Sequence, residues 1–209
     1  MFSNNSLPPS SSVPSNVTSA ISPVFSIAET IVSNRTTSNY NTTSNSSVTG
    51  PQPLIKDGSA GDPASIGVAV LLANWTGQGG QDYAGAATDQ LNYLFQNISQ
   101  TSDGAISHRV SELQLWCVRL FISPFLQPTI PSCHRSDFVY MVPPFLAYYG
   151  VLTQNSTLLW EAYQQINLYR NYLRDTSANN LWKHILLGKS GNDEGHWSTG
   201  WFSVFLIHA

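Results

Sequence analysis

The residue types best suited to chemistry lie within residues 103–150. His108 and Arg109 stand side by side in the run DGAISHR, and a single carboxylate, Asp137, opens the aromatic run SDFVYMVPPF. Apolar and aromatic neighbours withdraw water from a carboxyl group, which raises its pKa towards that of a general acid near neutral pH. Asp137 is therefore the candidate catalytic residue. It equally fits a helix N-cap before the Pro-Pro pair, and spacing alone favours the cap.

Donors for a sugar ligand stand upstream of this carboxylate. Arg109 can hold a carboxylate through two parallel N–H···O bonds, and His108 adds a donor for hydroxyls. An exposed loop pair is the alternative, which the two residues taken alone favour. Trp182, Trp197 and Trp201 could stack on pyranose rings, although a Trp more often packs in a core.

Glycosidases generally use two carboxylates that flank the scissile bond. Four acids could accompany Asp137, and the sequence does not choose among them: Asp82, Asp103, Glu112 and Asp193. His184 and His196 are too far apart for a compact metal motif, and no Cys accompanies them. We therefore expect no metal site.

The composition suits a globular domain with neutral, hydroxylated partners. Of the 209 residues, 42% are hydrophobic and 11% aromatic, but only 10% are charged, well below the usual ~25%. The formal charge of −3 comes without a basic cluster, which argues against nucleic acid because phosphate binding needs concentrated Lys and Arg. No run approaches the ~18 apolar residues of a membrane span. Such a surface fits a sugar-binding protein, and equally a secreted protein without a ligand.

Asn-x-Ser/Thr sequons favour the secretory route. They begin at Asn4, Asn16, Asn34, Asn41, Asn45, Asn74, Asn97 and Asn155. The first residues show no signal-peptide pattern, so we expect the natural start to lie upstream and the intact gene product to be secreted. The two cysteines, Cys117 and Cys133, could form one bridge but carry no disulfide framework.

Apolar spacing predicts helices in the first half of the chain. Residues 1–14 are expected to be a flexible leader, followed by an amphipathic helix from Ser15 that Pro23 kinks or delays. A helix is predicted from an N-cap at Asp62 to about Trp75. A glycine turn joins it to a second helix, from about Gln81 to Ile98, which makes an antiparallel hairpin.

The second half is predicted to be helical as well. The Pro-Pro pair prevents a regular helix across 137–144 but can begin one that runs to about Leu152. The strongest helix pattern covers Asn155–Leu173, with Asn155 or Ser156 as its cap. Residues 175–200 are predicted to be loop, since no strand alternation is convincing. The expected fold class is all-α.

Five runs together resemble the fungal branch of the six-hairpin glycosidases. They are GDPASIGVAVLLANWTGQGGQDYAGAATDQLNYLF, DGAISHR, SDFVYMVPPFLAYYG, LWKH and HWSTG. The most similar group is the unsaturated rhamnogalacturonyl hydrolases, glycoside hydrolase family 105, with its relative family 88. The resemblance covers about residues 15–116 and 136–200. It implies a partial (α/α)6 toroid of helical hairpins, roughly the N-terminal half, because six hairpins need about 330–400 residues.

Two segments depart from the family pattern. Around its catalytic aspartate the family resembles W-x-D-x-x-x-M, and removal of residues 117–135 would restore that pattern at Trp116 and Asp137. We interpret 117–135 as a retained intron or mispredicted exon within a domain at 15–209. The family also resembles W-x-x-G-N-G-W where this chain ends in an aberrant tail, 201–209. We expect this chain on its own to be poorly folded and inactive.

The resemblance implies a hydrolase acting on the unsaturated uronic acid that pectin lyases leave at a non-reducing end. In the family's mechanism an aspartic acid protonates the C4=C5 enol ether and helps water add at C5, after which the hemiketal opens and releases the next sugar. Asp137 matches that acid. The implied substrate-binding residues are His108, Arg109, Trp116, His184 and Trp197. The implied partner is an unsaturated pectic oligosaccharide, and no cofactor is implied.

Two other classes of function stay open. One is an inactive fragment or carbohydrate-binding remnant. The other is a structural, secreted α-helical glycoprotein without sugar chemistry. Another (α/α)6 enzyme would be expected to carry adjacent paired aspartates, which Asp137-Phe138 does not offer. The oligomeric state is not predicted.

Overall fold

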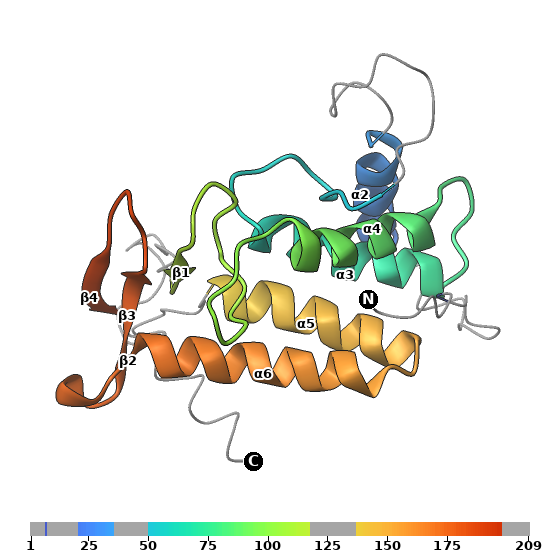
Figure 1. Ribbon diagram of the computed structural model, residues 1–209. Coiled ribbons are helices and arrows are strands. Elements are labelled where there is room, and N and C mark those ends of the chain that lie inside the picture. The colour runs from blue at the N-terminus through green and yellow to red at the C-terminus, as the bar shows by residue number, and fades with distance from the viewer. Residues whose placement is uncertain (1–6, 8–20, 36–49, 118–136, 198–209) are drawn as a thin grey trace, which may run out of the picture.

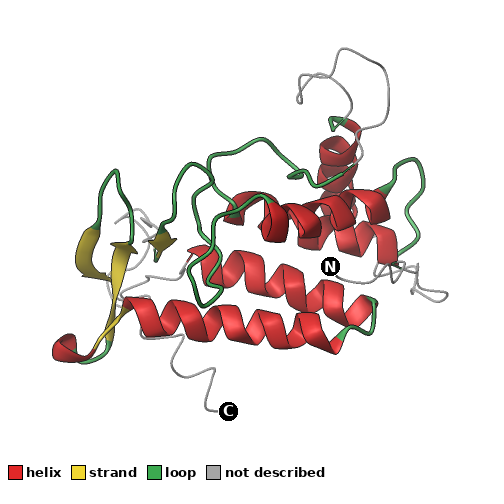
Figure 2. Ribbon diagram, viewed as in Figure 1, coloured by secondary structure: helices red, strands yellow, loops and turns green. Residues whose placement is uncertain are grey.

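Two helical hairpins form the body of the chain, and a small sheet lies at one end of them (Figures 1 and 2). The computed structural model describes residues 7, 21–35, 50–117 and 137–197. The predicted leader, apart from Leu7, and the predicted aberrant tail therefore lie outside the described residues. The helices are α2 (Ser22–Ser33), α3 (Gly61–Trp75), α4 (Tyr83–Gln96), α5 (Asp137–Leu152) and α6 (Ser156–Leu173), with a 3₁₀ turn at Thr176–Ala178. The mostly helical class and the helical hairpins are confirmed.

The first hairpin, α3 and α4, begins at a cap that differs from the predicted one. The hydroxyl of Ser59 accepts the N–H groups of Gly61 and Asp62 at 3.0 and 3.1 Å. The prediction of Asp62 as N-cap is therefore wrong: Asp62 lies in the first turn of α3, where a carboxylate still favours the helix dipole. Asp82 caps α4 by accepting the N–H of Gly85 at 2.8 Å.

The second hairpin contains the largest departure from the predicted helices. α5 is continuous across Pro143 and Pro144, so the prediction that these residues prevent a helix over 137–144 is wrong. Each Pro lacks an N–H and removes one helical hydrogen bond. Burial holds the helix together, since Phe138 stacks on Tyr169 of α6 with ring centroids 4.1 Å apart. Three further side chains of α5 are fully buried: Val142, Phe145 and Leu146.

For α6 and α2 the sequence left two possibilities for the helix start, and the structure decides between them. Asn155 caps α6, because its Oδ1 accepts the N–H groups of Thr157 and Leu158 at 3.0 and 3.3 Å. α2 begins at Ser22, so Pro23 stands in the first turn, where its missing N–H breaks no helical bond. Within the described ranges, no helix is long and apolar enough to cross a membrane.

The sheet replaces the loop predicted for residues 175–200. Its strands are β1 (Leu115–Trp116), β2 (Arg174–Asp175), β3 (Leu181–Leu186) and β4 (Asp193–Trp197). All pair antiparallel with β3, and Trp182 stands opposite Trp197 in the register. Trp182 is the one fully buried side chain of β3, and the described side chains of β4 are exposed. The strands therefore lack the alternation by which a half-buried strand is detected.

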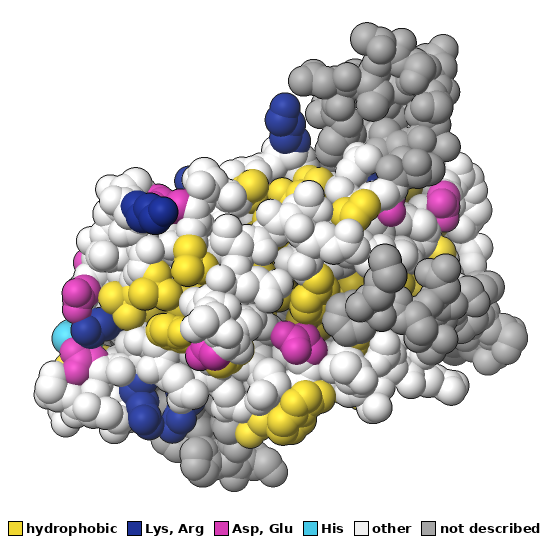
Figure 3. All heavy atoms as spheres, viewed as in Figure 1, with side chains coloured by type: hydrophobic (Ala, Val, Ile, Leu, Met, Phe, Trp, Pro, Cys, Tyr) yellow, Lys and Arg dark blue, Asp and Glu magenta, His cyan; other side chains and the backbone are white. Residues whose placement is uncertain are grey.

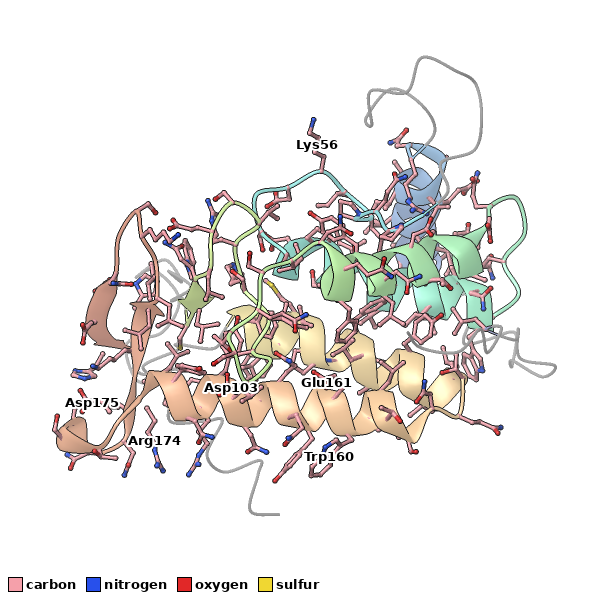
Figure 4. The ribbon with its side chains drawn as sticks, in the orientation of Figure 1. Lys56, Asp103, Trp160, Glu161, Arg174 and Asp175 are labelled. Atoms are coloured by element: carbon pink, nitrogen blue, oxygen red, sulfur yellow. The ribbon has the colours of Figure 1, made fainter. Side chains whose placement is uncertain are left out.

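Apolar side chains remain exposed on the outer faces of α5 and α6. Trp160 points away from α6 into solvent (Figure 4) and is 59% exposed, and Tyr148 of α5 is 56% exposed. Hydrophobic side chains reach the surface in several places (Figure 3). An apolar pocket of about 270 Å³ lies between α3 and α5, lined by Val68, Leu71, Leu72, Trp75, Tyr148, Val151 and Leu152. Exposed apolar faces of this kind fit a toroid of helical hairpins, in which each hairpin packs its outer face against the next hairpin.

The contact between α3 and α5 predicts a position that is intolerant of any side chain. A Cβ at Gly67 would lie 2.5 Å from Cδ2 of the buried Phe145 ring. We expect Gly67→Ala to lower the free energy of unfolding by about 1–3 kcal/mol, although Ala is the better helix former. Gly79→Ala is the matched control, because a Cβ there meets nothing within 4 Å. Equal thermal midpoints for the two variants would contradict the packing described for α3 and α5.

Candidate functional site

Four of the predicted site residues meet at the end of the helices that adjoins the sheet. The rings of His108 and Trp116 are stacked, with centroids 5.1 Å apart and planes 25° apart. Cζ of Arg109 lies 5.1 Å from the centroid of the Trp116 ring. His184 stands edge-on to Trp116, with centroids 6.0 Å apart. These four side chains are the ring cluster; their grouping agrees with the sugar-binding prediction without testing it.

The loop that carries His108 and Arg109 is anchored in α6. The N–H of Ile106 donates to Oε1 of Gln165 at 3.0 Å, and the hydroxyl of Tyr169 donates to the carbonyl of Ile106 at 2.7 Å. Nε2 of Gln165 also donates to the carbonyl of Gly104 at 2.7 Å. Gln165 and Tyr169 are both fully buried. Sequence reasoning missed Gln165, because a polar residue within a helix gives no sign that it faces the core.

The start of α3 holds the same loop from the other side. The N–H of Ala60 donates to the carbonyl of His108 at 2.7 Å, and the N–H of Val110 donates to the carbonyl of Gly58 at 3.0 Å. The hydroxyl of Ser59 lies 3.4 Å from Nε2 of His108. Ser59 thus both caps α3 and touches the ring cluster.

His108 is held neutral. It is 3% exposed, and burial lowers its pKa from 6.5 to about 4, helped by the charge of Arg109 and opposed by Asp57. Its buried Nδ1 has no hydrogen-bond partner among the residues that the structure describes. A neutral imidazole with an unused nitrogen can accept or donate one hydrogen bond to a ligand.

Met141, one turn into α5, lies close to this imidazole. A Cβ at Gly61 would stand 2.9 Å from Sδ of Met141 and 3.2 Å from Nδ1 of His108, so Met141 and His108 adjoin the same point of α3. α5 begins at Asp137, one turn before Met141. The side chains of Asp137 and Trp197 lie outside the described residues. Their catalytic and binding roles therefore stay predictions.

The four acids proposed as second carboxylates have separate partners. Asp82 caps α4. Asp103, beside α6 (Figure 4), is bonded to Thr101 and Tyr172, which lowers its pKa. Asp193 lies 2.7 Å from Nδ1 of His184, and this bond lowers the pKa of Asp193. Glu112 binds the loop between β3 and β4. Of these four, only Asp193 contacts the ring cluster directly.

Three further predictions concern the insert at 117–135, a bridge between the two cysteines, and a metal site. The backbone N–H of Cys117 donates to the carbonyl of His184 at 2.7 Å. The rest of the predicted insert, 117–135, lies outside the described residues, as does Cys133, so neither the insert nor the bridge is tested. Within the described ranges, no group of three or more His, Cys, Asp or Glu side chains could hold a metal ion.

Comparison with known proteins identifies the family of the chain. A family model described as Glycosyl Hydrolase Family 88 matches residues 25–201. No curated protein matches, and no solved structure matches. The match includes every residue of the ring cluster as well as Asp137. The finer assignment to family 105 stays a prediction.

The burial of His108 predicts a dependence of stability on pH. Because the pKa of His108 is about 4 in the folded chain and ordinarily 6.5, the unfolded chain binds a proton between these pH values that the folded chain does not. Stability therefore falls as the pH drops from 6.5 towards 4, by up to about 3 kcal/mol. Denaturant unfolding of the wild type and of His108→Gln, at neutral and mildly acidic pH, measures the contribution of His108 to the free energy of unfolding. An NMR titration midpoint of His108 near the ordinary 6.5 would contradict the prediction.

Proposed function

Because the chain belongs to Glycosyl Hydrolase Family 88, we propose that its gene product hydrolyses unsaturated uronyl oligosaccharides of pectic or rhamnogalacturonan origin. The observation that carries the proposal is the ring cluster, whose Trp116 stands on β1 near the start of α5 (Figure 1). An aromatic ring, a guanidinium and a neutral imidazole meet there, and α5 begins at Asp137, the residue predicted to be the acid.

Arg109 supplies the recognition of a uronate in this proposal. Its guanidinium makes a ring contact with Trp116, and no ion pair of Arg109 occurs among the described residues. Its N–H donors can therefore bind the sugar carboxylate through two parallel hydrogen bonds. Trp116 is partly exposed, so the exposed part of its ring can contact the sugar.

Asp137 performs the proton transfers. Its carboxyl group donates a proton to C4 of the C4=C5 bond, and the positive charge that forms at C5 is shared with the ring oxygen. Water adds at C5 and returns a proton to the carboxylate. The hemiketal opens by cleavage of the bond between C5 and the ring oxygen, and C1, now a hemiacetal, releases the next sugar. One carboxyl group thus serves as acid and base in turn.

Secretion of the gene product belongs to the same proposal. Asn97, of the sequon Asn97-Ile98-Ser99, is exposed at the end of α4, where a glycan would have room. Asn155 is half-buried and uses its Oδ1 to cap α6. Asn97 is therefore the better candidate of the two.

The proposed acid is tested by Asp137→Asn in the full-length gene product. The substrate is an unsaturated rhamnogalacturonan oligosaccharide made with a lyase, and the measurement is the loss of ultraviolet absorbance of its C4=C5 bond. Since an amide cannot donate the proton, we expect kcat to fall on the order of 10²–10⁴-fold. Asp82→Asn is the matched control, because Asn caps a helix as well as Asp does and Asp82 caps α4, which carries no residue of the ring cluster. Normal turnover by Asp137→Asn would refute the assignment.

A further inference from the structure

The carboxylate of Glu112 ties the loop between β3 and β4 to the segment before β1. Its Oε2 accepts the backbone N–H groups of Lys189 and Ser190 at 2.7 and 3.0 Å. Its Oε1 accepts the hydroxyl of Ser190 and Nε2 of Gln114, the latter at 3.0 Å. All four partners are donors, so only a carboxylate, which is acceptor at both oxygens, satisfies them together.

Gln114 extends this connection to the ring cluster. Its Oε1 accepts the indole N–H of Trp116 at 2.7 Å. Its Nε2 faces oxygen atoms only: Oε1 of Glu112, Oγ of Ser190 at 3.3 Å and the carbonyl of Gly191 at 3.2 Å. These partners fix the orientation of the amide, with its oxygen towards the indole. We call Glu112 and Gln114 the clamp.

The loop that the clamp holds has a conformation that needs outside support. Leu187 has φ of 67°, a left-handed conformation that is unfavourable for a bulky side chain and persists only where the surroundings fix it. A Cβ at Gly188 would collide with the amide of Gln114 and the carbonyl of Gly191. The loop therefore fits closely around the clamp.

The clamp joins two strands that both supply the ring cluster. Trp116 stands on β1, which has only two residues, and His184 stands on β3, next to the loop that Glu112 holds. Ring stacking leaves an indole some freedom to turn, whereas a hydrogen bond to its N–H fixes it in its plane. The sheet pairing and the clamp together determine how Trp116 faces His108, Arg109 and His184.

We propose that Glu112 and Gln114 are positioning residues, which fix the indole of Trp116, and with it Arg109 and His184, in the arrangement that receives the uronyl ring. The proposal rests on the function proposed above. It assigns to Glu112 a role in orienting the sugar site and no step of proton transfer.

The test compares Glu112→Gln and Gln114→Glu with the control Glu194→Gln in the full-length gene product. Glu112→Gln keeps the shape of the side chain but places an NH₂ group against the N–H donors that the carboxylate accepts. Gln114→Glu places a carboxylate against two oxygen acceptors, the carboxylate of Glu112 and the carbonyl of Gly191. Glu194 lies on β4 of the same hairpin, and its ion-pair partner among the described residues is Lys183, at 2.6 Å. Steady-state kinetics on the unsaturated oligosaccharide and thermal midpoints are measured for each protein.

We expect KM to rise about tenfold in both clamp variants, as loss of a hydrogen bond to a charged group would give, with kcat changed by less than about threefold. The control should resemble the wild type. An unchanged KM in Glu112→Gln overturns the proposal, as does a KM rise of equal size in Glu194→Gln. If Glu112→Gln does not fold, Ser190→Ala takes its place and should raise KM by a smaller factor. A wild type that leaves the double bond intact rejects the proposed function itself, before any variant is compared.

Discussion

Two buried polar side chains of α6 determine where the functional end of the molecule lies. Gln165 and Tyr169 satisfy both backbone groups of Ile106, and the loop that follows carries His108 and Arg109. A buried backbone group without a partner costs about 1–3 kcal/mol, so these hydrogen bonds stabilise the packing of the loop against α6. The stacking of Phe138 on Tyr169 extends the dependence to the first turn of α5. Two hydrogen bonds and one ring stack thus link the loop to both helices of the second hairpin.

The site is assembled from segments that are far apart in the sequence. Ser59 caps α3 and touches His108, while Met141 of α5 approaches the same turn of α3. β1 and β3 bring Trp116 and His184 together. Helix ends and a short sheet, both rich in polar backbone groups, surround a neutral imidazole and one guanidinium. Burial of the His108 imidazole depresses its pKa, so this ring enters the site as a neutral group beside the guanidinium of Arg109.

The sequence predicted the helices far better than the sheet or the polar contacts. Periodicity located α4 and α6, and Asn155 proved to be the cap of α6, one of the two residues predicted for it. Local rules failed at Pro143 and Pro144, because tertiary burial of α5 outweighs the two lost hydrogen bonds. β3 and β4 were missed because their side chains do not alternate between buried and exposed.

The grouping of the ring cluster was predicted from the resemblance, since no spacing rule connects residues 108 and 184. Gln114 and Gln165 were missed for a related reason: their value lies in hydrogen bonds to distant segments. The proposed hydration of a C4=C5 bond at this end of the molecule is tested most directly by the reaction of the full-length gene product in deuterium oxide, followed by NMR. We expect loss of the vinyl signal, with deuterium at C4 of the released product. Cleavage of the glycosidic bond with the double bond intact would contradict it.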